Sequence, residues 1–307
     1  MWPEQTEPFP GVMPDGSPWP RISVVTPSYN QAPFIEQTIR SVLLAGYPNL
    51  EYIIIDGGST DGSFEIIQKY EPWLSYWVSE PDGGHGDAIN KGFARSTGEI
   101  MAWLNSDDLY YPWTLRTVAN IMAALPQIEW LTTLSRGIVD AAGFCLGFSA
   151  LPGLSRDAFL DGYYLPLPIQ QESTFWRRTL WERAGGYIDT GCRLAVDFEL
   201  WCRLFLHAEL YGTASPLAGF RIHAGQRSDA TAEYVREATQ SLETMRQICK
   251  WSPERLRNWL ISATPLRRYP SIARRIGAAR PYAAKRASRS APRSAHSTWQ
   301  VEPYTFY

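Results

Sequence analysis

The residues best suited to chemistry are oxygen-bearing side chains that directly follow short apolar runs. The densest group is Asn105-Ser106-Asp107-Asp108, which comes after the run 99–104. Adjacent oxygen ligands on a tight turn suit a hard divalent cation, Mn²⁺ or Mg²⁺, that also bridges the oxygens of a diphosphate. The same aspartates could instead cap the next helix. Their place at the end of a strand favours the metal.

Two other polar groups follow apolar runs in the same way. Ser28-Tyr29-Asn30 comes after the run 21–27, and Asp56 comes directly after the run 50–55. The glycine-rich loop of dinucleotide enzymes, the P-loop and the nucleophile elbow of hydrolases are all absent from the sequence. The remaining chemistry is that of carboxylates and amides around a nucleotide or phosphate ligand.

The elements that position these groups alternate between strand and helix. Apolar β-branched runs predict strands over 21–26, 50–55, 73–79 and 99–104, and helical spacing predicts helices over 34–44, 62–70, 87–95 and 113–125. Such alternation indicates βαβ units and a parallel sheet. Ligands of open α/β sheets bind at the carboxyl ends of the strands, where the polar groups lie. Farther along, we expect helices near 197–206 and 231–249.

Composition and charge bound the class of protein. The 307 residues are 45% hydrophobic and 20% charged, which excludes a disordered, collagenous or disulfide-framework chain. The four cysteines show no CxxC pair and predict reduced thiols in the core of a cytosolic protein. We find neither a signal peptide nor an apolar run of the ~18 residues that a membrane helix needs. The sequence therefore predicts a cytoplasmic location.

The charge is divided unevenly along the chain. Residues 1–264 hold 20 Lys and Arg against 30 Asp and Glu, whereas residues 265–307 hold nine against one. The basic tail could be solvated and flexible, or it could contact anionic lipid on the inner face of the membrane, where each basic residue adds about 1 kcal/mol. Nucleic acid is not expected as a partner, because the body is acidic and shows no recognition motif.

Three motifs in chain order give the sequence its resemblance to a known family. They are Thr26-Pro27-Ser28-Tyr29-Asn30, Ile54-Ile55-Asp56-Gly57-Gly58-Ser59-Thr60-Asp61-Gly62 and Leu104-Asn105-Ser106-Asp107-Asp108. Together they resemble glycosyltransferase family 2, the inverting enzymes of the GT-A fold, over residues 20–225. The stretches 79–84 and 87–92 extend the similarity to a bacterial polysaccharide-type subgroup.

The resemblance implies the fold and the domain limits. We expect an α/β, GT-A-like fold, with a Rossmann-type, mostly parallel central sheet flanked by helices and a C-terminal helical extension. The predicted parts are an extended lead-in (1–20), a catalytic domain (21–235) with a donor half (21–130) and an acceptor half (131–235), a helical extension (236–264) and a basic, flexible tail (265–307).

The resemblance also implies roles for individual residues. Asp197, before an aromatic residue and Leu-Trp, would be the catalytic base, and Asp107 and His223 would hold the metal. Nucleotide-sugar binding would fall to Pro27, Tyr29, Asn30, Asp56, Asp82, Asn90, Lys91 and Asp107, and acceptor binding to Gln171, Glu172 and Asp108. Trp176 and Trp181 could stack on a sugar.

Purely structural roles are also open for several of these residues. Asp197 could cap its helix, or Glu199 could be the base in its place. Asp82, Asn90 and Lys91 could simply order a loop or cap a helix, and His85 could be a solvated loop residue or touch the donor sugar. His223 could be a structural histidine.

Two positions depart from the family pattern. Gly57 stands where the family usually has a second aspartate, and Asn105 stands where its metal signature usually begins with aspartate. An asparagine supplies a carbonyl ligand without charge, which lowers metal affinity. A non-catalytic nucleotide-sugar-binding protein with a degraded site is therefore the competing interpretation. A nucleotidyltransferase would need a glycine-rich basic loop after the first strand, and Pro27-Ser28-Tyr29-Asn30 is not one.

The expected activity is metal-dependent, inverting transfer of a hexose from a nucleotide diphosphate sugar, with a UDP-sugar favoured as donor. The expected acceptor is a glycan or a lipid-linked saccharide. Such an enzyme would act in polysaccharide or cell-envelope glycoconjugate synthesis.

Overall fold

The computed structural model describes residues 9–165, 168–227, 230–251, 282–290 and 298–306. Its first part is built on four short strands, β1 (Ile22–Ser28), β2 (Leu50–Asp56), β3 (Tyr76–Ser79) and β4 (Ile100–Trp103). They run parallel in the spatial order β4-β1-β2-β3. All seven residues of β1 are buried, because helices cover both faces of the sheet. This explains why the strands are continuous apolar runs rather than alternating ones.

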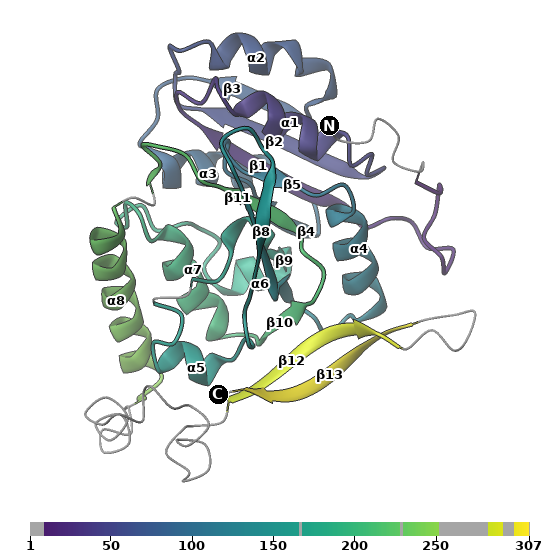
Figure 1. Cartoon of the computed structure of the whole chain (residues 1–307), viewed down its shortest axis with the longest axis vertical. Helices are drawn as coiled ribbons and strands as arrows, with labels where there is room; N and C mark the ends of the chain where they lie inside the picture. Colours follow the sequence, from purple (N-terminus) through teal and green to yellow (C-terminus); the bar gives the residue numbers. More distant parts are fainter. Residues whose placement is uncertain (1–8, 166–167, 228–229, 252–281, 291–297, 307) are drawn as a thin grey trace.

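Three helices connect these strands and a fourth follows β4, all within a few residues of their predicted limits. They are α1 (Ile35–Leu43), α2 (Ser63–Lys69), α3 (His85–Arg95) and α4 (Thr114–Ala124). The α3 helix packs its Ile89 and Phe93 on one face of the sheet, beside Val25. The helices α1, α2 and α4 cover the other face (Figure 1).

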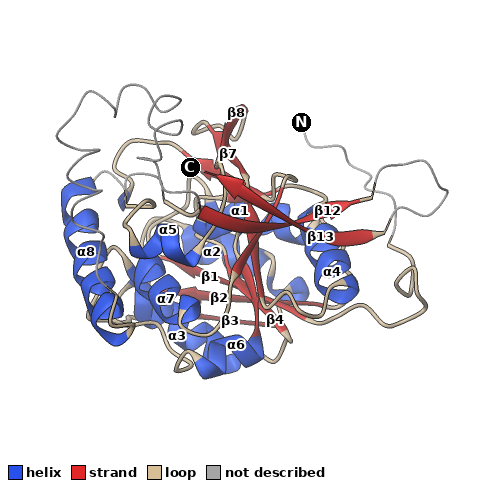
Figure 2. Ribbon diagram, turned by 90° about the horizontal axis from the view of Figure 1, so that it is seen from below, coloured by secondary structure: helices blue, strands red, loops and turns tan. Residues whose placement is uncertain are grey.

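The central sheet continues beyond β4 to nine strands, in the order β13-β12-β10-β6-β9-β4-β1-β2-β3. The added strands are β6 (Trp130–Thr133), β9 (Phe175–Arg177), β10 (Leu210–Thr213), β12 (Tyr282–Arg289) and β13 (Trp299–Phe306). Only β9 and β13 run antiparallel to their neighbours in this sheet of the described residues. The prediction of a mostly parallel sheet flanked by helices is confirmed (Figure 2).

A second, four-stranded sheet was not predicted from the sequence. Its order is β5-β11-β7-β8, with β5 (Leu109–Tyr110), β7 (Ser135–Val139), β8 (Cys145–Ala150) and β11 (Ala218–Arg221). The hairpin of β7 and β8 projects from the body of the molecule (Figure 2). This sheet matters for the site because β5 begins directly after Asp108 and β11 ends two residues before His223.

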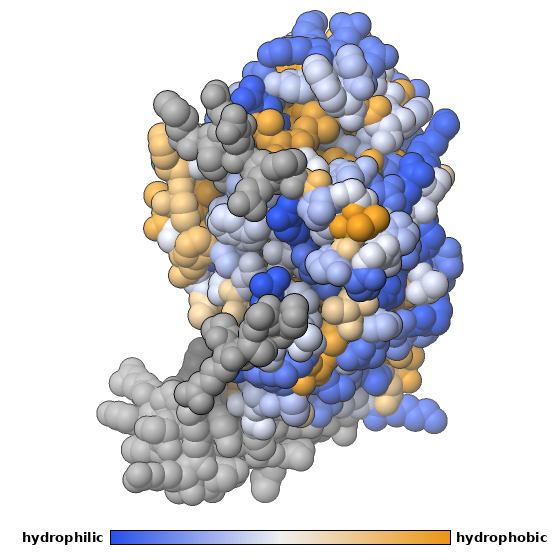
Figure 3. Space-filling model, turned by 90° about the vertical axis from the view of Figure 1, so that its right-hand side faces the viewer, coloured by the Kyte–Doolittle hydropathy of each residue, from blue (hydrophilic) through white to orange (hydrophobic). Residues whose placement is uncertain are grey.

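The remaining elements are helical. They are α5 (Arg156–Leu160), α6 (Arg178–Arg183), α7 (Val196–Phe205) and α8 (Thr231–Ile248), with short 3₁₀ turns η1 (Glu71–Trp73) and η2 (Gln171–Ser173). Among the described residues, no helix is both long and apolar enough to cross a membrane. On the face shown in Figure 3, apolar side chains form separate areas among hydrophilic ones.

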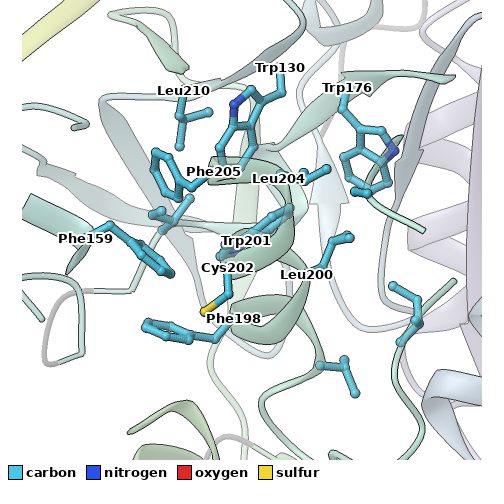
Figure 4. Packing of buried hydrophobic residues seen from close by; sticks show 14 of the residues in the cluster. Trp130, Phe159, Trp176, Phe198, Leu200, Trp201, Cys202, Leu204, Phe205 and Leu210 are labelled. Atoms are coloured by element: carbon cyan, nitrogen blue, oxygen red, sulfur yellow. The ribbon is translucent and has the colours of Figure 1, made fainter. Parts of the chain in front are cut away.

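Large aromatic side chains fill the core between the sheet and α7. Trp103, Trp130, Trp176 and Trp201 are at most 1% exposed, and their rings contact one another at centroid distances of 5.5–6.1 Å. Figure 4 shows Trp201 and Phe205 of α7 together with Trp130, Phe159 and Trp176 from neighbouring segments. The idea that Trp176 and Trp181 stack on a sugar is wrong, because both rings belong to this core.

Gly92 allows α3 to lie close to β1, and its replacement tests that contact. A Cβ at Gly92 would overlap the side chain of Val25, whereas a Cβ at Gly86 in the same helix would meet Ile188 at an ordinary 3.4 Å. Forced overlap in a packed core costs about 1–3 kcal/mol. We expect Gly92→Ala to lower the free energy of unfolding by that amount in a denaturant titration, and Gly86→Ala to leave it unchanged or slightly higher. Equal effects of the two variants would contradict this.

The C-terminal prediction needs correction. A flexible tail was expected over 265–307, but 282–290 and 298–306 form the hairpin of β12 and β13, which extends the central sheet beside β10. Ala284, Ala287 and Phe306 of this hairpin are buried. The segment is rich in Arg, Ala and Ser, so its few buried apolar positions did not indicate strands. The helix predicted over 231–249 is present as α8. Residues 252–264 of the expected helical extension lie outside the described residues, as do 265–281 and 291–297 of the expected tail.

The lead-in over 1–20 is better packed than its six prolines suggest. Residues 1–8 lie outside the described part, but the indole N–H of Trp19 donates to the carbonyl of Pro10 at 2.8 Å, and its ring lies edge-on to Tyr47. All four cysteines are free, as predicted, although only Cys202 is buried.

Candidate functional site

The carboxyl ends of β1, β2 and β3 lie level with one another, since Ser28 pairs with Asp56 and Asp56 with Ser79. The Asp56 side chain is buried, and it accepts hydrogen bonds from the backbone N–H of Ser59 (2.9 Å) and the hydroxyls of Ser59 (2.5 Å) and Ser79 (2.6 Å). The Asp56 carboxylate therefore holds the beginning of the loop after β2 in place.

The loops after β1 and β2 are tied together through Asn30. Its backbone, at a φ of 52°, donates from N–H to the Ser59 hydroxyl at 2.7 Å, and its side-chain oxygen accepts from the Thr60 N–H at 3.0 Å. Tyr29, the residue before Asn30, is 63% exposed, whereas Pro27 is buried in β1. The result is one free aromatic face at the strand ends, of the kind on which a base can stack.

Asp82 occupies the space beside Gly57. A Cβ at Gly57 would lie 3.1 Å from Oδ2 of Asp82. Oδ1 of Asp82 accepts from the Gly84 N–H at 2.7 Å, which fixes the carboxylate there. Asp82, in the loop after β3, therefore places a carboxylate close to where the side chain of the family's usual aspartate at position 57 would lie.

The two polar residues predicted on α3 make contacts within the protein. Asn90 donates to the carbonyl of Ile188 at 2.9 Å and accepts from its N–H at 2.7 Å. Lys91 lies 3.5 Å from Glu80 and 3.4 Å from Asp87. Asn90 therefore anchors the loop before α7, and the nucleotide-binding roles of both residues stay predictions.

Asp107 and His223 come together although they are 116 residues apart in the chain. Oδ2 of Asp107 lies 3.1 Å from Nε2 of His223. The imidazole packs against the ring of Phe34 at a centroid distance of 4.3 Å, and Nδ1 lies 3.0 Å from the carbonyl of Ala224. The predicted pair of metal ligands is adjacent in the structure.

This donor set fits a divalent cation that takes its other ligands from a substrate. A carboxylate oxygen and an imidazole nitrogen are ordinary ligands of Mn²⁺, and Mg²⁺ is usually held by one or two carboxylates together with phosphate oxygens and water. Oδ1 of Asn105 is buried and makes no hydrogen bond within the described chain. The part of the chain that the structure describes holds no cluster of three or more acidic, His or Cys ligands. Such a site would bind the cation chiefly together with a diphosphate.

Beneath the metal pair lies a buried acidic group. Asp108 and Glu172 are 1% and 4% exposed, and the Asn105 amide donates at 3.3 Å to both Asp108 and Gln171. Burial, reinforced by their mutual repulsion, raises the pKa of Asp108 well above its ordinary value. Burial also raises the pKa of Glu172, with Asp107 and Asp197 adding to the effect.

The residues predicted to bind the acceptor are therefore largely engaged inside the protein. Gln171 donates to the carbonyl of Trp103 at 2.8 Å, and Asp108 accepts from the Arg221 N–H at 2.9 Å. Oε1 of Glu172 is buried and has no hydrogen-bond partner among the described residues. Acceptor binding by these three residues stays a prediction.

Asp197 is the second residue of α7, and Ala195 holds the N-cap position. The Tyr234 hydroxyl lies 3.2 Å from both of its carboxylate oxygens. Burial raises the pKa of Asp197 to about 6, against hydrogen bonds from the Phe198 N–H and Tyr234. The alternative base, Glu199, is held by Arg203 through bonds of 2.7 and 2.6 Å. Asp197 is the better placed of the two.

Sequence reasoning missed two residues at this site, Arg227 and Tyr234. Burial lowers the pKa of Arg227, and both Asp197 and Asp107 attract its charge, which places it near the predicted base and the metal pair. Burial next to Arg227 lowers the pKa of His85 to about 3, so its ring is neutral at physiological pH. An arginine four residues after His223 was the available signal, and Tyr234 had none.

Comparisons with known proteins agree with this fold. The family model described as glycosyl transferase family 2 matches residues 23–140. An uncharacterized glycosyltransferase of Nostoc sp. is 36% identical over 247 residues, covering 74% of each chain. One of Mycobacterium tuberculosis is 32% identical over 201 residues, covering 62% of this chain and 71% of its own.

Solved structures show the same fold at low identity. TarS of S. aureus, residues 1–349 in complex with UDP-GlcNAc, has a TM-score of 0.59 at 18% identity, covering 73% of this chain and 66% of its own. The mannosyltransferase PcManGT of Pyrobaculum calidifontis, in complex with GDP-Man and Mn²⁺, has a TM-score of 0.52 at 17% identity and covers 85% and 87%. By its sequence matches, the chain belongs to glycosyltransferase family 2, and by its structure it is a glycosyltransferase of the GT-A fold.

Proposed function

We propose that this enzyme transfers a hexose from a nucleotide diphosphate sugar to a hydroxyl of a glycan or lipid-linked acceptor, with a divalent metal and with inversion at the anomeric carbon. The observation that carries the proposal is the pairing of Asp107 with His223 at the strand-end edge of the sheet. The attraction of Arg227 to both Asp107 and Asp197 supports a base close to that pair.

Asp197 is the proposed general base. Its carboxylate takes the proton from the acceptor hydroxyl while the hydroxyl oxygen attacks the anomeric carbon from the face opposite the diphosphate, which inverts the configuration. A pKa of about 6 suits this task, because the group is mostly ionised at neutral pH and is more basic than an ordinary aspartate. One carboxylate is enough for a single displacement.

Asp107 and His223 would hold Mn²⁺ or Mg²⁺, which when bound neutralises negative charge on the departing diphosphate. Arg227 supplies a further positive charge in the same region. The Tyr29 ring and the carboxylates of Asp56 and Asp82 are proposed to bound the nucleobase pocket. A UDP-sugar is the favoured donor, since TarS was solved with UDP-GlcNAc, although PcManGT was solved with GDP-Man.

Thermal shift tests the donor site. We expect one family among UDP-, GDP- and dTDP-sugars to raise the unfolding midpoint of the wild type, and the rise to depend on Mn²⁺. A ligand at a hundred times its Kd adds about 2.7 kcal/mol of stability. Asp107→Ala should lose the Mn²⁺-dependent part, whereas Asp15→Ala, in an exposed turn far from the strand ends, should keep it. A full response in Asp107→Ala would remove Asp107 from the metal site.

A second measurement separates the enzyme from the competing binder with a degraded site. A transferase without acceptor slowly hydrolyses its donor, so we expect Mn²⁺-dependent release of the nucleotide diphosphate. A nucleotide that stabilises the protein but is never hydrolysed or transferred would favour the binder.

The place of action follows from the acceptor. A lipid-linked saccharide would bring the enzyme to the cytoplasmic face of the membrane, in polysaccharide or envelope synthesis. Contact of the basic C-terminal part with anionic lipid stays a prediction, and Lys285, Arg286 and Arg289 already lie over the rings of Tyr211, Tyr304 and Trp299.

A further inference from the structure

The helix α8 lies along α7, outside the region that the family model matches (Figure 1). Two of its residues, Tyr234 and Glu237, are three positions apart and therefore lie on one side of the helix. Both make hydrogen bonds to the beginning of α7, where Asp197 lies. No sequence motif links α8 with the site.

Glu237 holds the segment that leads into α7. Its carboxylate accepts from the backbone N–H groups of Arg193, Leu194 and Ala195 at 2.8–3.2 Å. Although burial alone would raise it, these N–H donors hold the pKa of Glu237 below its ordinary value. The start of α7 is thus fixed to α8 by a charged acceptor.

Tyr234, one turn earlier, contacts the predicted base itself. Its hydroxyl is 3.2 Å from Oδ1 and from Oδ2 of Asp197, so the phenolic proton is shared between the two oxygens. The other groups that act on this carboxylate are Arg227, which attracts its charge, the Phe198 N–H, which donates to it, and Glu172, which repels it.

We propose that Tyr234 is a positioning residue for the catalytic base, which it orients toward the acceptor hydroxyl while Glu237 fixes the helix that carries the base. The inference rests on the proposed role of Asp197. A hydrogen bond to the charged form of a carboxyl group lowers its pKa. Tyr234 therefore also extends the pH range over which Asp197 can accept a proton.

A titration of the free protein tests this without any substrate. In protein labelled with ¹³C at the aspartate carboxyl carbon, the Asp197 signal is identified by its absence from Asp197→Asn. We expect its midpoint, about 6 in the wild type, to rise by about one pH unit in Tyr234→Phe. The matched control is Tyr304→Phe, whose hydroxyl makes no hydrogen bond within the described residues. It should leave the midpoint unchanged.

The activity should follow the titration. For UDP release from UDP-GlcNAc with Mn²⁺, a midpoint higher by one unit predicts about a fivefold loss of kcat in Tyr234→Phe near pH 6, about twofold near pH 7, and almost none above about pH 8. The KM for UDP-GlcNAc should not change. A purely structural defect would lower the rate equally at every pH.

The outcomes separate the two proposals. An unmoved Asp197 midpoint in Tyr234→Phe, or a loss of rate that is independent of pH, would overturn the role of Tyr234 even where Asp197→Asn is inactive. Full hydrolysis by Asp197→Asn would instead overturn the base assignment, and the carboxyl titration would still report on the hydrogen bond.

Discussion

Asp197→Asn should lower the rate of sugar transfer by about 10³-fold while nucleotide binding stays within about twofold, because a positioned general base contributes roughly 10²–10⁴ to a rate. The amide has nearly the shape of the carboxylate, and it can still accept the hydrogen bond from Tyr234. It cannot take a proton from the acceptor. The effect should therefore appear in kcat and leave the KM for the donor almost unchanged.

The matched control lies two residues away on the same helix. Glu199→Gln removes a carboxylate that is bound to Arg203, at some cost in stability, and should leave kcat nearly intact. The measurement is product release under saturating donor, with the thermal midpoint of each variant checked first. A variant pair in which Glu199→Gln is inactive and Asp197→Asn is active would reverse the assignment.

The pH dependence follows from the same residue. Because burial raises the pKa of Asp197 to about 6, its carboxylate gains a proton as the pH falls through that value. The kcat of the wild type should thus decline below about pH 6, far above the pKa of an ordinary aspartate. In Asp197→Asn, the residual rate should lack this acidic limb.

Much of the structure over 21–130 could be predicted from the sequence, because the apolar runs there match the buried strands of the sheet. The apolar runs of β1, β2 and β4 are buried on both faces, and a polar residue marks the end of each. The place of Asp107 follows from that rule alone, since the carboxyl ends of parallel strands share one edge. The resemblance then supplied His223, and the structure places it 3.1 Å from Asp107.

The second sheet could not be predicted, because its pairings join short segments that are far apart in the sequence. The β5 strand is only two residues long, and β11 pairs with β7 across some 80 residues. Neither segment has an apolar period long enough to signal a strand. Their pairing is nevertheless what brings Arg221 and His223 to the loop that contains Asp107.

Position 57 shows how a departure from a family pattern can be misjudged from one sequence. Gly57 suggested the loss of a carboxylate, yet the space for a side chain there is taken by Asp82 from the next loop. Only the three-dimensional arrangement shows this exchange, because spacing along the chain does not reveal which loops touch. The argument for a degraded donor site is correspondingly weaker.

Arg221→Met should lower the free energy of unfolding by about 3–5 kcal/mol, the range for breaking a buried charged network. The Arg221 residue is 1% exposed, and its guanidinium donates to the carbonyls of Asp107 (2.5 Å) and Ala141 (2.8 Å) and to the side chain of Gln37 (3.0 Å). It thereby joins the loop of Asp107, the turn between β7 and β8, and α1 to the end of β11. Methionine fills a similar volume but leaves all three acceptors without this donor.

Because one of these acceptors is the backbone of Asp107, the same variant should also weaken the Mn²⁺-dependent response to nucleotide. Denaturant unfolding with and without Mn²⁺ and UDP-GlcNAc measures both effects. The control, Arg95→Met, removes an exposed guanidinium that lies 4.6 Å from the ring centroid of Tyr76 and should cost less than about 1 kcal/mol. If Arg221→Met kept its stability and lost only the metal response, the guanidinium would serve the metal loop alone and the three segments would be held together by their apolar contacts.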